Sequence, residues 1–187
     1  RAVEGIDHAP RQTHQFDHQR VALRVVLRRA ALFDFGQAVA QGPVADLLAR
    51  LDIAQTHGDA AGALIDGVVD QVDAAYHLLQ VRFGGGTIQC VQAPGAPLRQ
   101  PGQRVRLRVQ ARDVSLTLHA AHDTSILNVL AARVTSLAAD GPAQVLVALD
   151  VGGTPLLARV TRKSADALQL APGQRVFAQI KGVAVLD

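Results

Sequence analysis

The sequence contains no Met and no Trp, and aromatic residues make up only 3% of its 187 residues. A hydrophobic core must therefore be built mainly from Val, Leu, Ile and Ala. Cys90 is the single cysteine, so an internal disulfide and a cysteine-based metal cluster are excluded. No uninterrupted apolar run reaches the roughly 18 residues of a membrane-spanning helix, so we expect a cytoplasmic chain without direct membrane insertion. Because Met is absent, we expect a fragment, a processed product or an incomplete reading frame.

The charge balance argues against a nucleic-acid partner. The 19 basic and 16 acidic residues leave a formal net charge of only +3, and the arginines are scattered. Proteins that bind nucleic acid carry a basic stripe, and those that bind single strands add aromatic stacking platforms, which are scarce here. A nucleic-acid-binding OB protein stays an alternative that a strong, salt-dependent affinity for DNA or RNA would support.

Residues 1–35 differ in composition from the rest of the chain, because Arg, His and Gln are crowded together there. Val21 to Leu32 fits a short basic helix, although Val25-Val26 favours a strand equally. Three histidines indicate a metal site only weakly, since no acidic residues support them: His8, His14 and His18. We expect an atypical leader that is poorly ordered or translated out of frame, with the native frame restored near Gly36.

Residues 36–58 read as a turn, a short strand and a helix. Pro43 fits the first helical turn, where its missing N–H is not needed. The helical period places four apolar residues on one face: Val44, Leu47, Leu48 and Leu51. The small and polar residues from Gln55 to Gly62 then form a linker and a candidate domain boundary.

The chain beyond this linker repeats itself. Pro101–Val105 reads Pro-Gly-Gln-Arg-Val, and Pro172–Val176 has the same sequence. Before each copy an apolar strand leads into a glycine turn, where Gly85-Gly86-Thr87 aligns with Gly152-Gly153-Thr154. The period of about 70 residues is longer than that of solenoid repeats. We therefore predict two copies of one small β module.

Within each copy the pattern is that of short strands joined by glycine-containing turns. Apolar and polar residues alternate from Arg104 to Ala111 and from Val176 to Lys181, which is strand period. Five such strands fit a small OB-like barrel. We predict a mainly β fold in which residues 60–120 and residues 123–187 each form an OB-like small β-barrel module, after a short α/β remnant.

The end of the chain, from Pro155 to Leu186, is expected to contain a strand that ends at Val160, a short helix and a final strand. Ser164 is expected to cap the helix, and Asp166 in its first turn suits the positive end of the helix dipole. Pro172-Gly173 is expected to stop the helix, since Pro cannot continue it.

Hydroxyl and ammonium groups gather in sequence around this helix start: Thr161, Lys163, Ser164 and Lys181. N–H and O–H donors, with no carboxylate close in sequence except Asp166, provide what a small tetrahedral oxyanion requires. A capping serine and solvated lysines explain the same residues. The residues alone therefore leave both interpretations open.

Three motifs occur in the order found in the molybdate-binding Mop (TOBE) domains, which the chain resembles over residues 123–186: Asp123–Val134, Ala158–Leu168 and Gln179–Val185. The resemblance implies a regulatory module that binds molybdate or tungstate as ligand, senses the oxyanion, and forms a homodimer that shares strands or sites. It also implies the oxyanion contacts: Thr124, Ser125, Asn128, Thr161, Ser164, Lys181 and the backbone of Gly182. The family loop reads Thr-Ser-Ala-Arg-Asn, whereas Leu127 stands here in place of the arginine, so a dimerisation module that has lost oxyanion binding is an alternative.

The whole of residues 36–187 resembles the C-terminal part of the ATP-binding subunit of a molybdate ABC importer. Ala40–Leu48 is similar to the end of its nucleotide-binding domain, and Ala111–Leu116 to the strand before its Mop module. The resemblance implies a parent protein that couples ATP hydrolysis to molybdate import and contacts a membrane permease subunit through the missing nucleotide-binding domain. It would lie on the cytoplasmic side of the inner membrane as a peripheral subunit. The chain itself contains no Walker A loop and no signature motif, so we expect no ATP site and no enzyme activity in it.

Two further classes of function remain as alternatives. A stand-alone molybdate-binding protein, either a buffer or the sensing half of a regulator, would have the same C-terminal motifs without the segment from Gly36 to Asp52. A hydrolase would use a Ser/His/Asp set, for which the candidates are close in sequence: His119, His122, Asp123 and Ser125. No nucleophile elbow accompanies them, so solvated loop residues are the simpler interpretation.

Overall fold

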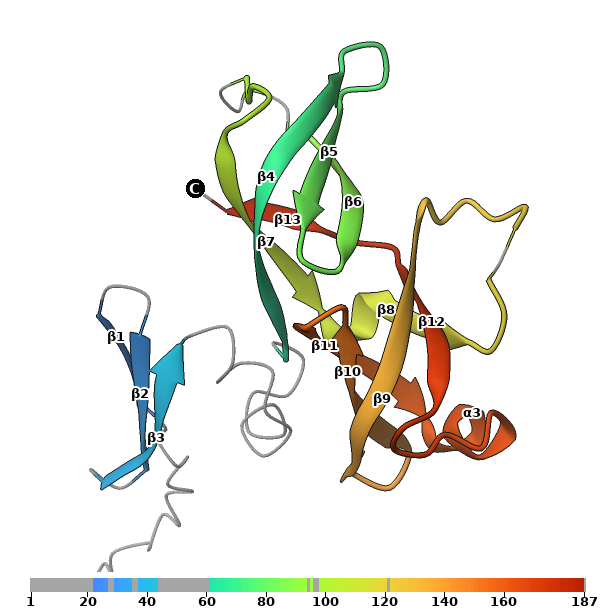
Figure 1. Ribbon diagram of the computed structural model, residues 1–187. Helices are drawn as coiled ribbons and strands as arrows, with labels where there is room; N and C mark the ends of the chain where they lie inside the picture. The colour runs from blue at the N-terminus through green and yellow to red at the C-terminus, as the bar shows by residue number, and fades with distance from the viewer. Residues whose placement is uncertain are drawn as a thin grey trace, which may run out of the picture.

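The structure is a computed structural model that describes residues 22–26, 29–34, 37–43, 61–93, 95, 98–120 and 122–186. Strands dominate these residues, which confirms the predicted mainly β fold (Figure 1). The elements are β1 (Ala22–Val26), β2 (Arg29–Asp34), β3 (Gln37–Pro43), β4 (Gly62–Asp73), β5 (Leu78–Phe83), β6 (Gly86–Val91), β7 (Arg104–Gln110), the 3-10 turn η2 (Ala111–Asp113), β8 (Val114–Thr117), β9 (Asn128–Asp140), β10 (Gln144–Val151), β11 (Thr154–Thr161), the helix α3 (Arg162–Ala167), β12 (Arg175–Ile180) and β13 (Ala184–Leu186).

The first three strands form a separate antiparallel sheet in the order β1-β2-β3. β1 and β2 occupy the segment where the sequence left helix and strand open. The domain boundary expected at residue 36 falls between two paired strands, since Asp34 of β2 lies opposite Gln37 of β3. Pro43 is the last residue of β3 and not part of a helix. The helix expected from Val44 onward lies outside the described residues.

The rest of the chain builds two five-stranded sheets of matching order. One sheet has the order β6-β5-β4-β7-β13, and the other has the order β11-β10-β9-β12-β8. Each strand of the first sheet has its counterpart in the second, as the internal sequence repeat predicts. The repeat therefore reflects two copies of one five-stranded unit.

The two units exchange their last strands, which the sequence did not reveal. β8 lies in the first repeat but pairs with β12 of the second, Val114 lying opposite Ile180. β13 belongs to the second repeat but pairs with β7 of the first, Ala184 lying opposite Arg108. The predicted modules of residues 60–120 and 123–187 are thus wrong at their ends, because each sheet is completed by a strand from the other.

Strand register also corrects the alignment of the two repeats by one residue. Phe83 lies opposite Gly86 across the first hairpin, and Val151 lies opposite Thr154 across the second. The matching two-residue turns are therefore 84–85 and 152–153. These turns touch, because a Cβ on Gly152 would lie 2.9 Å from the Cα of Gly85. Only glycine permits so close an approach of two backbones.

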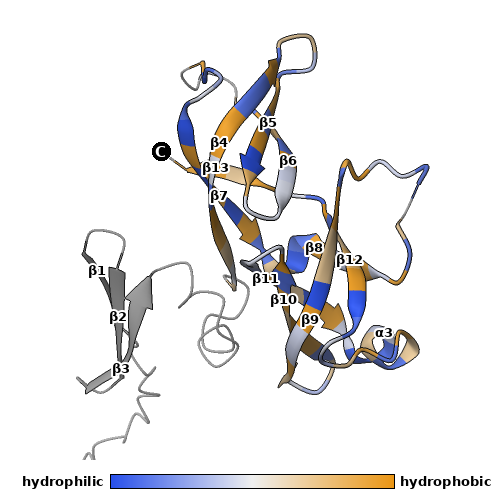
Figure 2. Cartoon of the chain, in the orientation of Figure 1, coloured by the Kyte–Doolittle hydropathy of each residue, from blue (hydrophilic) through white to orange (hydrophobic). Residues whose placement is uncertain are grey.

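Alternation along the strands creates a shared core between the sheets. Val105, Leu107 and Val109 point inward from β7, and Val176, Ala178 and Ile180 do so from β12, as predicted. These residues belong to one continuous hydrophobic cluster with members from both sheets. Its content is mainly Val, Leu, Ile and Ala, and apolar residues alternate with polar ones along the ribbon in Figure 2. The two units therefore fold against each other and not as independent barrels.

The short helix α3 begins and ends differently from the prediction. Thr161, and not Ser164, is the N-cap, because the Thr161 Oγ1 accepts a hydrogen bond from the Ser164 N–H at 3.0 Å. Asp166 lies beyond the first turn. The helix ends at Ala167, and Gln169 then adopts a left-handed φ of 50°, so the helix stops before Pro172 is reached.

Candidate functional site

A hollow of about 260 Å³ lies where the loop before β9 meets the segment between β12 and β13. It brings together four of the predicted oxyanion residues: Ser125, Asn128, Lys181 and Gly182. Its remaining lining residues are Leu78, Gln89, Cys90, Val91, Ile126, Leu127, Ile180 and Val183. Thr124 stands next to the hollow, where its Oγ1 accepts a hydrogen bond from the Ile126 N–H at 3.2 Å and shapes the loop.

Lys181 is the cationic side chain of the described lining and is exposed to solvent. Its backbone N–H donates to the carbonyl oxygen of Asp113 at 2.9 Å, which holds the segment from Lys181 to Val183 against the η2 turn. The ammonium group therefore sits at the point where the chain crosses from one sheet to the other. A solvated point charge on a flexible stem can approach a small anion placed there.

A carboxylate lies beside the same segment, which the sequence did not predict. A Cβ built on Gly182 would come within 2.8 Å of the Asp113 Oδ2. A side chain at this position would force the Asp113 carboxylate to move. Asp113 is far from these donors in the sequence, so the statement that only Asp166 is close in sequence does not cover it. An anion bound at Lys181 would experience repulsion from Asp113.

Asn128 is buried and its side-chain amide is already engaged. Its Oδ1 accepts from the Gln89 N–H at 2.7 Å, and its Nδ2 donates to the Gln89 carbonyl oxygen at 2.8 Å. A longer contact of 3.4 Å joins Nδ2 to the carbonyl oxygen of Ile180. The amide thus extends the hydrogen-bonding pattern of a strand from β6 to β9. The Asn128 side chain therefore links the two sheets and holds the end of the loop before β9 in place.

The other predicted pair, Thr161 and Ser164, lies elsewhere on the same chain. Thr161 of β11 lies opposite Gln144 of β10, and Gln144 lies opposite Asp140 of β9. Thr161 is therefore in line with the Asp140 end of β9. Lys181 follows Ile180, which lies opposite Asn128 at the near end of β9. A strand of this length extends roughly 40 Å at about 3.3 Å per residue. One chain cannot bring both groups to one small anion.

Thr161 and Ser164 nevertheless form a local arrangement of donors. Their hydroxyl oxygens are 2.8 Å apart and both side chains are exposed at the start of α3. Leu127, at the position of the family arginine, is also exposed, with 62% of its surface accessible. The hollow beside Lys181 is therefore rimmed by apolar surface where the family has a fixed positive charge.

The residues of the hydrolase alternative do not assemble. His119, His122 and Asp123 are exposed loop residues, and no described hydrogen bond joins either histidine to Ser125. Within the described ranges no group of three or more His, Cys, Asp or Glu side chains could hold a metal ion. The histidines suggested as weak metal ligands, His8, His14 and His18, lie outside these ranges.

Sequence reasoning missed two features of the site, namely Asp113 and the pairing of Asn128 with Gln89. Asp113 belongs to the segment Ala111–Leu116 that the resemblance pointed to, but its proximity to Gly182 depends on the exchange of β8 and β13. Cys90 also lines the hollow, and burial raises the pKa of its thiol to about 11. The thiol is therefore protonated at neutral pH and is not a nucleophile there.

Comparison with known families supports the predicted resemblance to TOBE domains. Residues 124–186 match the model of the TOBE domain family. The match begins at the loop that borders the hollow and ends with β13.

Curated relatives show which proteins contain a region similar to this chain. The chain is 50% identical to the molybdenum import ATP-binding protein ModC of Albidiferax ferrireducens over 93% of its own length and 45% of the relative. It is 46% identical to the ModC protein of Aromatoleum aromaticum over 97% of its own length and 44% of that relative. These matches confirm the predicted resemblance to the C-terminal part of such a subunit. The chain spans less than half the length of these relatives. The similarity also extends into residues 1–35, which weighs against a change of reading frame near Gly36.

A solved structure shares the paired-sheet fold. The crystal structure of the cytoplasmic molybdate-binding protein ModG, with molybdate bound, is 26% identical and aligns with a TM-score of 0.58. The alignment covers 65% of this chain and 93% of ModG. In the part of the chain that the structure describes, no helix is long and apolar enough to cross a membrane.

Proposed function

We propose that this chain is the oxyanion-sensing regulatory part of the ATP-binding subunit of a molybdate importer. The observation that carries the proposal is the hollow that brings Ser125, Lys181 and Gly182 together inside a TOBE domain. Lys181 supplies the positive charge, and the Ser125 hydroxyl and the backbone near Gly182 supply donors to a tetrahedral dianion.

A homodimer would complete the site. Thr161 and Ser164 lie at the opposite end of β9 from Lys181, so on one chain they cannot reach the same ion. A second copy in antiparallel arrangement would place its hydroxyl pair beside the first copy's lysine. Symmetric pairing of this kind is the commonest form of assembly among soluble oligomers. Two equivalent sites would result in each dimer.

The ligand that fits this chemistry is molybdate or tungstate. Both are tetrahedral dianions, and the ModG structure described above has molybdate bound on a similar fold. The parent subunit would couple ATP hydrolysis to molybdate import and contact a membrane permease subunit at the cytoplasmic side of the inner membrane. Binding of the oxyanion to this part would then report its intracellular concentration to the transporter.

The second candidate is a dimerisation module that has lost oxyanion binding. Two observations favour it, namely the apolar Leu127 in place of an arginine and the Asp113 carboxylate beside Gly182. Both reduce the positive potential that a dianion would meet. The two candidates agree on dimerisation and differ only in ligand binding.

Calorimetric titration of the full chain with molybdate, with sulfate as control, tests the first proposal. We expect saturable molybdate binding that Lys181→Ala weakens about 10- to 100-fold, the range expected for one hydrogen bond to a charged group. Lys181→Arg retains the charge and should retain most of the affinity. Thr161→Ala should weaken binding without affecting the dimer measured by sedimentation velocity. A folded dimer that takes up no molybdate would support the dimerisation module instead.

A further inference from the structure

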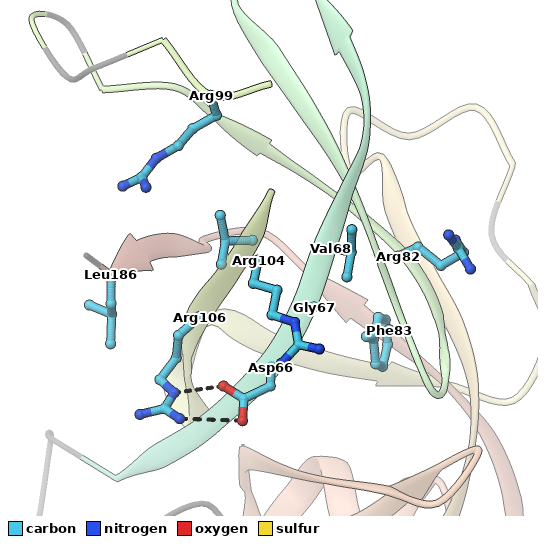
Figure 3. A pocket seen from close by; sticks show the side chains of 10 residues that line it. Asp66, Gly67, Val68, Arg82, Phe83, Arg99, Arg104, Arg106 and Leu186 are labelled. Carbon is cyan, nitrogen blue, oxygen red and sulfur yellow. Dashed lines mark hydrogen bonds and ion pairs between the residues drawn. The ribbon is translucent and has the colours of Figure 1, made fainter. Parts of the chain in front are cut away.

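A second hollow lies on the first sheet and shares no lining residue with the site around Lys181. Its volume is about 560 Å³, and Figure 3 shows the side chains that line it. It is lined by Asp66, Gly67, Val68, Arg82, Phe83, Arg99, Arg104, Val105, Arg106 and Leu186. Four arginines and one aspartate thus surround a space formed by β4, β5, β7 and β13. Leu186 comes from the exchanged strand, so the hollow is complete only when β13 has joined the first sheet.

The arginines of this hollow are arranged by strand register. Arg106 lies opposite Asp66, and its Nε and Nη2 donate to the two carboxylate oxygens at 2.7 and 3.3 Å. This two-point contact fixes the orientation of the guanidinium group, as Figure 3 shows. Two residues along β4 from Asp66, Val68 lies opposite Arg82 of β5 on one side and opposite Arg104 of β7 on the other. Arg82 forms a longer contact of 3.4 Å with Asp70.

Arg104 is the cation that the hollow leaves without an acidic partner. Its side chain is exposed and reaches across the neighbouring strand β4 in Figure 3. No carboxylate among the described residues forms an ion pair with it. The guanidinium is charged at any physiological pH and offers a planar set of donors. It is therefore available to bind an anion that enters the hollow.

The second sheet shows that the fold does not require these arginines. Phe177 lies opposite Ala131 at the place equivalent to Arg106 and Asp66. Asp150 occupies the place of Arg82, since it lies opposite Arg133 as Arg82 lies opposite Val68. The Arg106–Asp66 pair and Arg82 are therefore particular to the first sheet, whereas Arg104 has a counterpart in Arg175.

We propose that this hollow binds an organic anion that carries phosphate groups and has about the size of a nucleotide. Arginine forks match the geometry of phosphate oxygens in two-point contacts. The volume falls within the roughly 300–1,000 Å³ of sites for organic ligands and is far larger than one tetrahedral oxyanion requires. Val68, Phe83 and Leu186 add an apolar surface that the body of such a ligand can contact. The two hollows share no lining residue, so this binding chemistry does not require molybdate at Lys181.

The proposal is tested by calorimetric titration of the full chain, saturated with molybdate, using four probes. ADP carries phosphates and an organic body, adenosine the body alone, pyrophosphate the charge alone, and citrate carboxylates without phosphate. We expect saturable binding of ADP, weaker binding of pyrophosphate, and no binding of adenosine or citrate. Arg104→Gln should reduce the ADP affinity at least about tenfold.

Arg175→Gln is the matched control, because Arg175 occupies the position of Arg104 in the second sheet. It removes the same charge from an equivalent exposed site and should leave the ADP affinity unchanged. Circular dichroism checks that both variants are folded. The proposal is overturned if ADP does not bind, if citrate binds more tightly than ADP, or if both substitutions weaken ADP equally, which would indicate a general charge effect.

Discussion

Replacing Asn128 by Ala should destabilise the protein by uncoupling its two sheets. The Asn128 amide forms two short hydrogen bonds with the backbone of Gln89, at 2.7 and 2.8 Å, across the boundary between β9 and β6. The side chain is only 7% exposed, so water cannot readily replace it. Alanine would leave the N–H and the carbonyl oxygen of Gln89 without their partner. It would also leave a small cavity between the sheets.

The expected magnitude follows from these losses. Each unsatisfied, partly buried backbone group reduces stability by about 1–3 kcal/mol, so the total for the two groups should be about 2–6 kcal/mol. For a chain of this size, each kcal/mol lost lowers the melting temperature by about 2–4 °C, so we expect a decrease of roughly 4–24 °C. Urea unfolding followed by circular dichroism measures the free energy, and calorimetry measures the melting temperature.

Two further variants make the test specific. Thr124→Ala removes one exposed hydrogen bond to Ile126 in the same loop and should reduce stability by less than about 1 kcal/mol. Asn128→Asp keeps the acceptor for the Gln89 N–H but, when ionised, loses the donor to the Gln89 carbonyl oxygen, so its effect should be intermediate and should become smaller as low pH protonates the carboxyl. If Asn128→Ala were no more destabilising than Thr124→Ala, the amide would not join the two sheets as described.

Three other predictions follow from contacts near the site. Gly85→Ala should destabilise the fold by more than about 2 kcal/mol, measured by urea unfolding, because the added Cβ would overlap the carbonyl oxygen of Val151. Burial raises the pKa of Cys90 to about 11 from 9.0, so the folded protein should become less stable as the pH rises from about 9 to 11. Cys90→Ala should remove that loss in pH-dependent unfolding, and iodoacetamide should modify the wild-type thiol at pH 8 much more slowly than in the unfolded chain. Asp113→Asn should strengthen molybdate binding roughly tenfold in calorimetry, because one like charge beside Gly182 is removed; unchanged affinity would place the ion away from this segment.

Local chemistry explains why much of the fold could be predicted from the sequence. Period-two alternation identifies the inward side chains of β7 and β12, because a strand turns successive residues to opposite faces. Paired glycines and Pro-Gly pairs mark the turns for steric reasons that are independent of the remaining chain. The internal repeat then indicates two copies of the unit.

The exchange of strands could not be predicted in this way. β8 and β13 are short apolar segments that would fit the edge of either sheet, and their own residues do not select between them. The choice depends on the crossing of the chain at Asp113 and Gly182, which are 69 positions apart in the sequence. The one-residue error in aligning the glycine turns has a similar origin, since three consecutive glycines permit two alignments and only the strand pairing selects one.

The candidate site could be predicted only in part, because some of its contacts depend on how the strands are arranged in the sheets. Resemblance to a family named Ser125, Lys181 and Gly182 as oxyanion contacts, and the three residues line one hollow. Motif order does not show that Thr161 is at the far end of β9, because that separation is a property of the sheet. Nor does it show the role of Asn128, whose partner is a backbone group in the other repeat.

The repeat also explains why the two sheets have different binding chemistry. The position of Lys181 is occupied by Gln110 in the first sheet, and that of Asn128 by Ala63, so the first sheet does not reproduce the oxyanion site. It has its arginines on the outer face instead. The exchanged strand β13 physically joins the two places, since it begins two residues after Gly182 and ends at Leu186 in the arginine-lined hollow. A shift of the segment at Gly182 on anion binding would therefore be transmitted along three residues of paired strand, so the affinity of either site should depend on occupancy of the other by the same factor.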